Sequence, residues 1–146
     1  LRRQRQMCIR DRPKIDYKIK PWNINGKQIL EIYIPKSNRK PHLAKDTDNN
    51  WKAYIRVDDH NFLANNILIR TWKEKNKRHV EIKYSRKEEF LLQYLKDYDS
   101  ITFEKFCELA EISNKEAENI LVNFLILDII KMKISENEII YFFNDL

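Results

Sequence analysis

The sequence predicts an α+β protein of two units: a partial mixed sheet with a short helix, then three helices and a β-hairpin. Apolar and polar residues alternate along much of the first half, which is the pattern of half-buried strands. In the second half, apolar residues recur at helical spacing. Charge also separates the halves, because residues 13–80 hold 15 Lys and Arg against 7 Asp and Glu, whereas residues 81–146 hold 8 against 14. This asymmetry favours two units with different partners.

Composition limits the class of protein. The 146 residues are 42% hydrophobic and 34% charged, with a formal net charge of +6, which suits one domain or two small ones. No apolar run approaches the roughly 20 residues of a membrane helix. The two Cys lie far apart and suggest no disulfide framework, so we expect the protein to be located in a reducing cytoplasm. We expect Cys107 to be a core thiol. The three His have no ligand spacing, so we predict no metal site. We predict no other cofactor, and no contact with a membrane.

The first twelve residues are treated separately. The segment Arg-Arg-Gln-Arg-Gln-Met-Cys-Ile-Arg-Asp-Arg at 2–12 resembles the translation of sequencing-adapter read-through. We therefore predict that residues 1–12 are not native, as for fusion scars that are excluded from fold reasoning. The alternative is a basic arm that binds nucleic acid. If they are not native, Cys8 and five Arg drop out, and the chain is a C-terminal fragment of a longer protein.

The first unit begins with a predicted hairpin. Residues 15–20 alternate Ile or Tyr with Asp or Lys and predict a strand. Asn25-Gly26 is the strongest short hairpin signal, because both residues tolerate positive φ. Residues 29–34 predict a second strand that is apolar on both faces and therefore internal to the sheet. Pro35 ends it, since proline cannot donate to the ladder.

A loop follows from residue 36 to residue 50. Loops of this length in a compact unit are usually functional or disordered. Its start is cationic, and we predict that these side chains contact nucleic acid: Lys36, Arg39, Lys40, His42 and Lys45. A solvated loop is the alternative. Residues 46–50, Asp-Thr-Asp-Asn-Asn, are typical of a turn rather than a calcium loop, because Trp51 stands where a calcium loop needs glycine.

Residues 51–57 predict another strand, followed by a short amphipathic helix. Asp58 or Asp59 is the expected N-cap of that helix, which would take in residues 62–69. Arg56 is the most suggestive position on the strand, because an arginine beside an aromatic residue suits backbone and base contacts. A cross-strand ion pair with Glu31 would leave the same pattern.

The order of these motifs resembles a known family. Lys-x-x-Arg-Lys-Pro-His at 36–42, Ala-Tyr-Ile-Arg at 53–56 and Asp-x-Asn-Phe-x-Ala-Asn at 59–65 look like the C-terminal half of a Schlafen/AlbA-type DNA-binding domain, in its Bacteroidetes-type versions. The resemblance covers about residues 14–72. It implies that the N-terminal half, with its Glu- and Lys-containing helix and Gly-Gly turn, is missing. Related nucleases take their acidic residues from that half, so no catalytic residue is predicted here. With one glycine, no phosphate-binding loop supports the ATP-binding label of the family.

The second unit contains three helix-start signals and a hairpin. Ser85 and Glu88 form a capping box, Thr102 can cap a second helix, and Ser113 opens a third. Residues 130–134 then alternate apolar side chains with lysine, 135–138 turn, and 139–143 return as a second strand. This order resembles a winged helix-turn-helix. We therefore divide the chain into residues 13–76 for the Schlafen/AlbA-type part, 77–84 for a linker and 85–146 for the winged-helix part.

The expected function is nucleic-acid binding, to DNA rather than RNA, by a fragment of a bacterial transcription regulator. Besides the loop cations, the predicted contacts are Arg56, Lys131 and Lys133, the last two on the wing. The third helix offers Lys115, Asn119 and Asn123 as side chains that could read bases. Its unit has an excess of acidic residues, however, which argues against DNA binding because phosphate contacts dominate affinity. Two alternatives stay open. One is a nuclease whose acidic site lies in the missing half, although the fragment itself is not expected to be an enzyme. The other is an oligomerisation module that pairs through the winged-helix unit.

Overall fold

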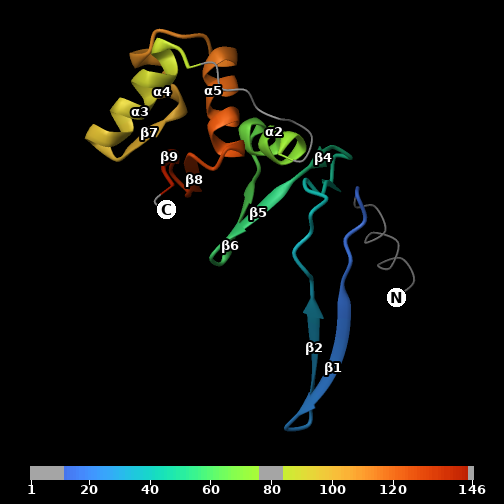
Figure 1. Cartoon of the computed structure of the whole chain (residues 1–146). Coiled ribbons are helices and arrows are strands. Elements are labelled where there is room, and N and C mark those ends of the chain that lie inside the picture. The colour runs from blue at the N-terminus through green and yellow to red at the C-terminus, as the bar shows by residue number, and fades with distance from the viewer. Residues whose placement is uncertain (1–11, 76–83, 145–146) are drawn as a thin grey trace. The chain divides into compact units, whose positions relative to one another are not determined.

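The computed structural model describes residues 12–75 and 84–144 and divides the chain into two compact units, residues 1–54 and residues 55–146 (Figure 1). Each unit is described by itself. Within the described residues, every helix is too short or too polar to cross a membrane.

The first unit is built around an antiparallel hairpin. Strand β1 (Lys18–Ile24) pairs with β2 (Lys27–Tyr33), and Lys18 lies opposite Tyr33 in the register. Asn25 and Gly26 make the turn with φ values of 52° and 77°, which confirms the hairpin predicted from this dipeptide. Across the strands, Trp22 Nε1 donates to Glu31 Oε2 at 2.6 Å.

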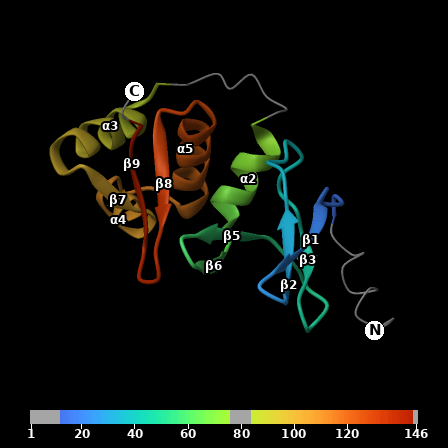
Figure 2. The same cartoon turned by 90° about the horizontal axis from the view of Figure 1, so that it is seen from below.

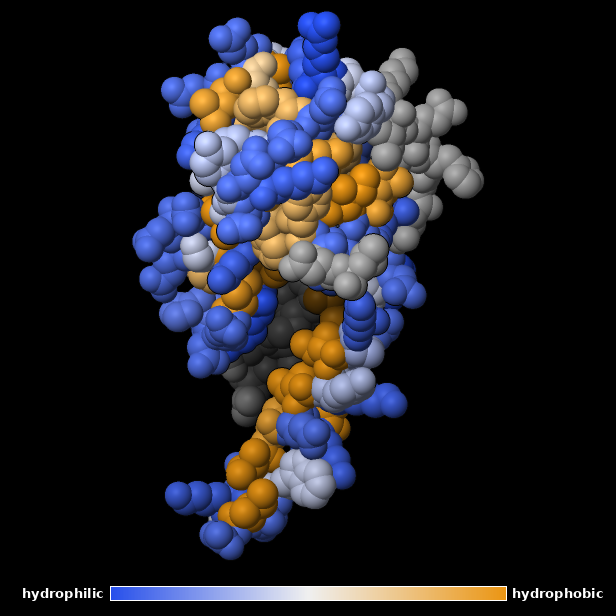
Figure 3. Space-filling model, turned by 60° about the vertical axis from the view of Figure 1, so that its left-hand side comes forward, coloured by the Kyte–Doolittle hydropathy of each residue, from blue (hydrophilic) through white to orange (hydrophobic). Residues whose placement is uncertain are grey.

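Both faces of this hairpin are open to solvent. Ile19 on β1 is 52% exposed and Ile32 on β2 is 55% exposed. Figure 3 shows hydrophobic side chains at the surface along the protruding hairpin. The prediction of an internal strand at 29–34 is wrong for the part of the chain that the structure describes, because β2 pairs there with β1 alone. An apolar pattern on both faces shows that a strand could be covered on both sides. The pattern alone does not place a covering element there.

A second, smaller hairpin closes the loop. Strands β3 (Ala44–Lys45) and β4 (Trp51–Lys52) pair antiparallel. Asp46 Oδ1 accepts from the backbone N–H groups of Asp48 and Asn50, both at 2.9 Å, which confirms the predicted turn. The Lys52 ammonium lies 2.7 Å from Asp46 Oδ2 and, chiefly by this hydrogen bond, lowers the pKa of the Asp46 carboxyl.

The predicted helix over residues 62–69 needs correction. Strands β5 (Tyr54–Val57) and β6 (His60–Leu63) form a third hairpin, and Asp58, at φ 51°, lies in its turn. Helix α2 (Asn66–Glu74) begins only afterwards. Its N-cap is Asn65, whose Oδ1 accepts from Leu68 N at 2.8 Å. Asp58 and Asp59 therefore do not cap it, since the chain turns back as a strand directly after them.

The C-terminal elements form a winged helix. In chain order they are α3 (Arg86–Tyr98), β7 (Ser100–Thr102), α4 (Phe103–Leu109), α5 (Asn114–Ile126), β8 (Ile130–Ile134) and β9 (Ile139–Phe143). The three strands make an antiparallel sheet in the order β7-β9-β8 (Figure 2). The α+β class and the winged-helix architecture are confirmed. Strand β7 was not predicted, because three residues between two helices give too short a pattern to recognise.

Local capping signals fix where these helices begin. At α3 the Ser85 hydroxyl and the Glu88 carboxylate complete a capping box. At α4 the Thr102 hydroxyl accepts from Lys105 N, and at α5 the Ser113 hydroxyl accepts from Glu116 N, both at 3.3 Å. All three predicted helix starts are confirmed.

The core lies between these helices and the inner face of the sheet. Ile130 and Tyr141 point into it from β8 and β9 and are 1% and 0% exposed. Cys107 is half-buried against this core, and its burial raises the pKa of its thiol, as expected of a core thiol. The largest side chains with almost no exposed surface are Tyr141, Phe106, Phe124, Leu91, Leu95, Leu121, Ile130 and Val122.

Helix α2 belongs to this second unit, where it packs on α5. The structural boundary therefore falls between Tyr54 and Ile55, whereas the charge pattern placed a linker at 77–84. Residues 76–83 lie outside the described residues. The division into 1–12, 13–76, 77–84 and 85–146 stays a prediction.

Candidate nucleic-acid interface

Four of the predicted basic residues line one cavity of the first unit. The cavity has a volume of about 440 Å³ and lies where β2 ends and the cationic loop begins. Lys36, Arg39, Lys40 and His42 all contribute to its wall, together with the exposed carboxylate of Asp16. Three permanent positive charges and one histidine thus meet a single acid. This arrangement suits an anionic group such as a phosphate.

Arg39 is held in place from two directions. Its Nη2 lies 3.0 Å from Asp16 Oδ2 and donates to the Lys14 backbone carbonyl at 3.3 Å. The side chain is still 57% exposed, so most of its five N–H donors face solvent. An arginine fixed by one acid can present its remaining donors to a second anion.

His42 lines the same cavity, and one of its ring nitrogens is buried. Its Nδ1 lies 2.8 Å from the Pro13 backbone oxygen. A carbonyl oxygen only accepts, so Nδ1 carries the proton. The other nitrogen, Nε2, is buried and has no hydrogen-bond partner among the described residues.

Two other predicted residues lie outside that cavity. Lys45 on β3 donates to Asn49 Oδ1 at 3.4 Å, and its ammonium lies 5.4 Å from the centre of the Trp51 ring. Arg56 on β5 pairs with Asp59 Oδ1 at 3.3 Å and with Asn61 Oδ1 at 3.4 Å. The partner of Arg56 is therefore the turn of its own hairpin. Glu31, the alternative partner weighed from the sequence, accepts from Trp22.

The two wing lysines are exposed on the outer face of the sheet. Lys131 and Lys133 alternate on β8 with the buried Ile130 and Ile134. In the register they stand opposite Phe142 and Ile140 of β9, which are half-buried. The outer face thus combines cations with apolar side chains, which suits a protein surface as well as a phosphate backbone.

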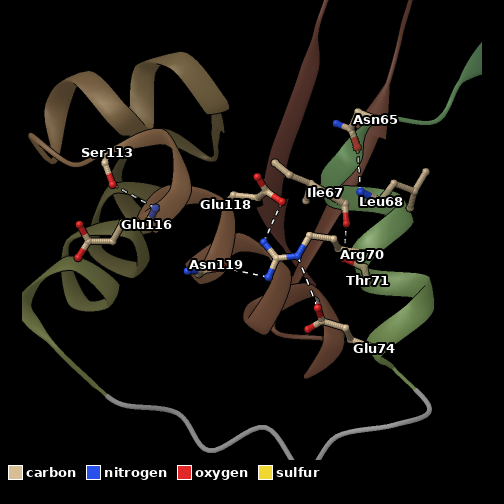
Figure 4. A network of polar contacts seen from close by, with 10 residues as sticks. All are labelled: Asn65, Ile67, Leu68, Arg70, Thr71, Glu74, Ser113, Glu116, Glu118 and Asn119. Carbon is tan, nitrogen blue, oxygen red and sulfur yellow. Dashed lines mark hydrogen bonds and ion pairs between the residues drawn. The ribbon is translucent and has the colours of Figure 1, made fainter.

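Helix α2 engages part of the third helix of the winged helix. Arg70 of α2 reaches across to α5, where its Nη1 lies 2.8 Å from Glu118 Oε1 and its Nη2 donates to Asn119 Oδ1 at 3.0 Å (Figure 4). Asn119, one of the side chains expected to read bases, is thus hydrogen-bonded to a residue of the same chain, although it is exposed. At the other end of the same contact Lys75 lies 2.7 Å from Asp128 Oδ1.

Sequence reasoning missed Arg70, although a signal was present. Glu74 stands four residues later on the same helix, and its Oε1 lies 3.5 Å from Arg70 Nε. The hydrogen bond that Arg70 donates to Glu118 is the main reason that the pKa of Arg70 is raised. Arg70 of α2 and Lys75 at its C-cap therefore neutralise acidic residues of the winged helix, which reduces their attraction for nucleic acid.

The fold and the basic cavity define an α+β protein that joins a basic, hairpin-rich segment to a winged helix. The chain belongs to the PCI domain family, whose model matches residues 60–144, more than half of the chain. A second family model, described as Schlafen, AlbA_2, matches residues 2–65. No curated protein and no solved structure matched the chain.

These matches refine the resemblance seen in the sequence. The Schlafen match is at the N-terminal end of this chain and begins within residues 1–12. It gives no support to the narrower prediction that only the C-terminal half of that domain is present. The two families are consistent with a nucleic-acid-binding or regulatory role.

Proposed function

We propose that the chain binds nucleic acid through the cavity formed by Lys36, Arg39, Lys40 and His42, with DNA preferred over RNA, and that it acts in transcription regulation. The observation that carries the proposal is that these four side chains, chosen from sequence alone, line one cavity. The Schlafen, AlbA_2 match over residues 2–65 supports the same reading. The preference for DNA rests on the resemblance to the DNA-binding type of this domain.

The chemistry proposed at the cavity is charge neutralisation of phosphates. Each phosphate contact releases condensed counterions, so the affinity falls steeply as salt rises. Arg39 can hold a phosphate oxygen with donors that Asp16 does not use, while Lys36 and Lys40 act as point charges on either side of it in sequence. Nothing in this arrangement reads bases, so the binding is expected to depend weakly on sequence.

The test is fluorescence anisotropy with a labelled DNA duplex and an RNA strand of equal length, over a range of salt concentrations. In the full chain, Lys36→Ala and Lys40→Ala should each weaken binding about three- to tenfold and reduce the slope of log affinity against log salt by about 1. Lys27→Ala is the matched control, because Lys27 is an exposed lysine of β2 outside the cavity.

The outcomes separate clearly. Equal losses in Lys27→Ala and Lys36→Ala would mean that only the net charge matters, and the cavity would carry no binding site. Affinity independent of salt would also contradict the proposal. Tighter binding of RNA than of DNA would reverse the proposed preference.

A second candidate function is self-assembly through the winged helix. The observation in its favour is that α2 occupies part of the face of α5, which leaves the outer sheet surface for contacts. The excess of acidic residues in 81–146 complements the excess of basic residues in 13–80 of another copy. Light scattering of the full chain over a wide concentration range tests it, and a strict monomer at the highest concentration would contradict it.

A further inference from the structure

The basic cavity of the first unit carries more positive charge than one backbone phosphate balances. Its cations are Lys36, Arg39 and Lys40, and Asp16 is the one acidic side chain among its lining residues. With His42 neutral, the wall therefore has a surplus of two positive charges. A phosphodiester of a nucleic-acid backbone has a single negative charge, whereas a phosphate monoester has a charge of about −1.5 to −2 at pH 7. The surplus matches the monoester better than the diester.

The cations of the wall are gathered on one short segment. Ser37 Oγ accepts from the Arg39 backbone N–H at 3.1 Å, so the hydroxyl holds residues 37–39 in a turn. Lys36 precedes this turn and Lys40 follows it. All three charges thus come from five consecutive residues. A groove that follows a nucleic-acid backbone distributes its cations over a longer path, so this arrangement favours a single phosphate group.

Arg39 keeps two nitrogens for a ligand. Its contacts with Asp16 and with the Lys14 carbonyl both use Nη2. Nη1 and Nε are not used in these contacts, and the side chain is largely open to solvent. Hydrogen bonds from a guanidinium to a phosphate oxygen are charge-assisted and roughly twice as strong as neutral ones. A monoester has three terminal oxygens, so it can accept from all three cations of the wall.

Another part of the same wall is apolar. Ile15, Ile34 and Pro35 line the cavity together with the cations. Its volume of about 440 Å³ lies toward the lower end for small-molecule sites, which favours one nucleotide over a longer run of strand. An internal phosphodiester carries nucleotides on both sides, whereas a terminal phosphate carries a nucleotide on one side only. The sugar of that nucleotide can lie against the apolar part of the wall.

We propose that this cavity binds a phosphate monoester, as carried by the end of a nucleic-acid strand. The phosphate oxygens lie on the three cations, and the sugar lies against Ile34 and Pro35. The inference rests on the proposed function, because it names the part of the nucleic acid that enters the same cavity. It goes further, since binding by charge along the backbone would favour no particular phosphate. Neither family match assigns a ligand to these residues.

The test is fluorescence anisotropy of the full chain with a DNA strand that is labelled at an internal position. The strand carries a phosphate at its 5′ end, at its 3′ end or at neither end. An end phosphate should tighten binding about tenfold, since it adds charge-assisted hydrogen bonds. A hydroxyl-ended strand two nucleotides longer is the matched control, because it adds a similar charge in the form of phosphodiesters. Its affinity should stay close to that of the shorter hydroxyl-ended strand.

Variants of the protein test the same preference through the ratio of the two affinities. Arg39→Gln should lower the tenfold preference to about two- to threefold, since it removes one of the three partners of the phosphate. Arg56→Gln is the matched control, because Arg56 is an exposed arginine outside the cavity and its loss changes the net charge equally. It should leave the ratio unchanged. Circular dichroism checks that both variants are folded.

The outcomes separate this inference from the proposed function. Equal affinity for phosphate-ended and hydroxyl-ended strands, with the salt dependence retained, would overturn the inference and leave the proposed function standing. An equal fall of the ratio in Arg39→Gln and Arg56→Gln would also overturn it. The absence of binding by every strand would contradict the proposed function.

A free 5′-mononucleotide, measured by calorimetric titration, separates the two sources of a phosphate monoester. Tighter binding of the phosphate-ended strand than of the mononucleotide supports a strand end. Tighter binding of the mononucleotide supports a free nucleotide at the same cations. The absence of binding by the mononucleotide and by every strand would overturn the site altogether.

Discussion

Two hairpins of this protein have nearly the same sequence pattern and opposite environments. Strand β1 alternates lysine with isoleucine at 18–20, and strand β8 alternates lysine with isoleucine and methionine from Ile130 to Ile134. Yet Ile19 is 52% exposed and Ile130 is 1% exposed. The helices of the winged helix cover the inner face of the β8–β9 hairpin, whereas β1–β2 has no covering layer among the described residues. Alternation therefore predicts a strand, while burial depends on elements far away in the sequence.

The largest expected effect comes from removing the buried isoleucine. Ile130→Ala should lower the free energy of unfolding by about 2–5 kcal/mol, since it loses apolar burial and leaves a cavity in the core. Ile19→Ala, at the equivalent position of the exposed hairpin, should change it by less than about 0.5 kcal/mol. Urea unfolding of the full chain, followed by circular dichroism, measures both. Similar losses in the two variants would show that β1–β2 is covered in solution.

Alkaline pH offers a second way to separate the hairpins. Tyr141 on β9 has its pKa raised from 10.0 to about 12, so the folded state holds this proton more tightly than the unfolded state does. The associated stability is complete below pH 10 and is lost as the pH rises toward 12, by about 2 to 3 kcal/mol in total. Tyr141→Phe should remove this loss, as measured by urea unfolding at several pH values. Tyr33→Phe, in the exposed strand β2, should leave the curve as it is.

A smaller effect is expected where α2 covers α5. A double-mutant cycle of Arg70→Ala and Glu118→Ala should give a coupling free energy of about 1 kcal/mol, the upper end for a partly exposed pair. Thermal unfolding of the unsubstituted chain, the two single variants and the double variant supplies the four corners of the cycle. A coupling of zero would mean that α2 is not held on α5 by this pair.

The smallest effect on global stability should come from the turn of the exposed hairpin. Gly26→Ala forces a side chain into the left-handed region at φ 77°, which costs about 1–2 kcal/mol locally. Because β1–β2 adds nothing to the buried core, the main unfolding transition should move by less than about 0.5 kcal/mol. NMR chemical shifts of residues 18–33 should change nonetheless. A large shift of the main transition would indicate that the two units unfold together.

The features that could be predicted from the sequence are those decided within a few residues. The caps at Ser85, Thr102 and Ser113, the Asn25-Gly26 turn and the winged-helix order all follow from local hydrogen bonding and periodicity. The cavity side chains of 36–42 could be chosen because they are clustered along the chain. The position of α2 could not, since Arg70 and Glu118 are 48 residues apart. The same holds for the burial of Tyr141, which lies in one core cluster with residues far from it in the sequence, such as Ile67 and Leu91.

The uncovered β1–β2 hairpin has one further consequence, for aggregation. Each of its strands has an edge without a partner among the described residues, and such edges are templates for another chain. On β1, Pro21 removes a donor from the edge, and Lys18 and Lys20 act as gatekeepers, because like charges keep two copies from pairing. Salt screens that repulsion just as it screens phosphate contacts. If the chain binds nucleic acid as proposed, a rise in ionic strength weakens that binding and at the same time favours adhesion between copies of the chain.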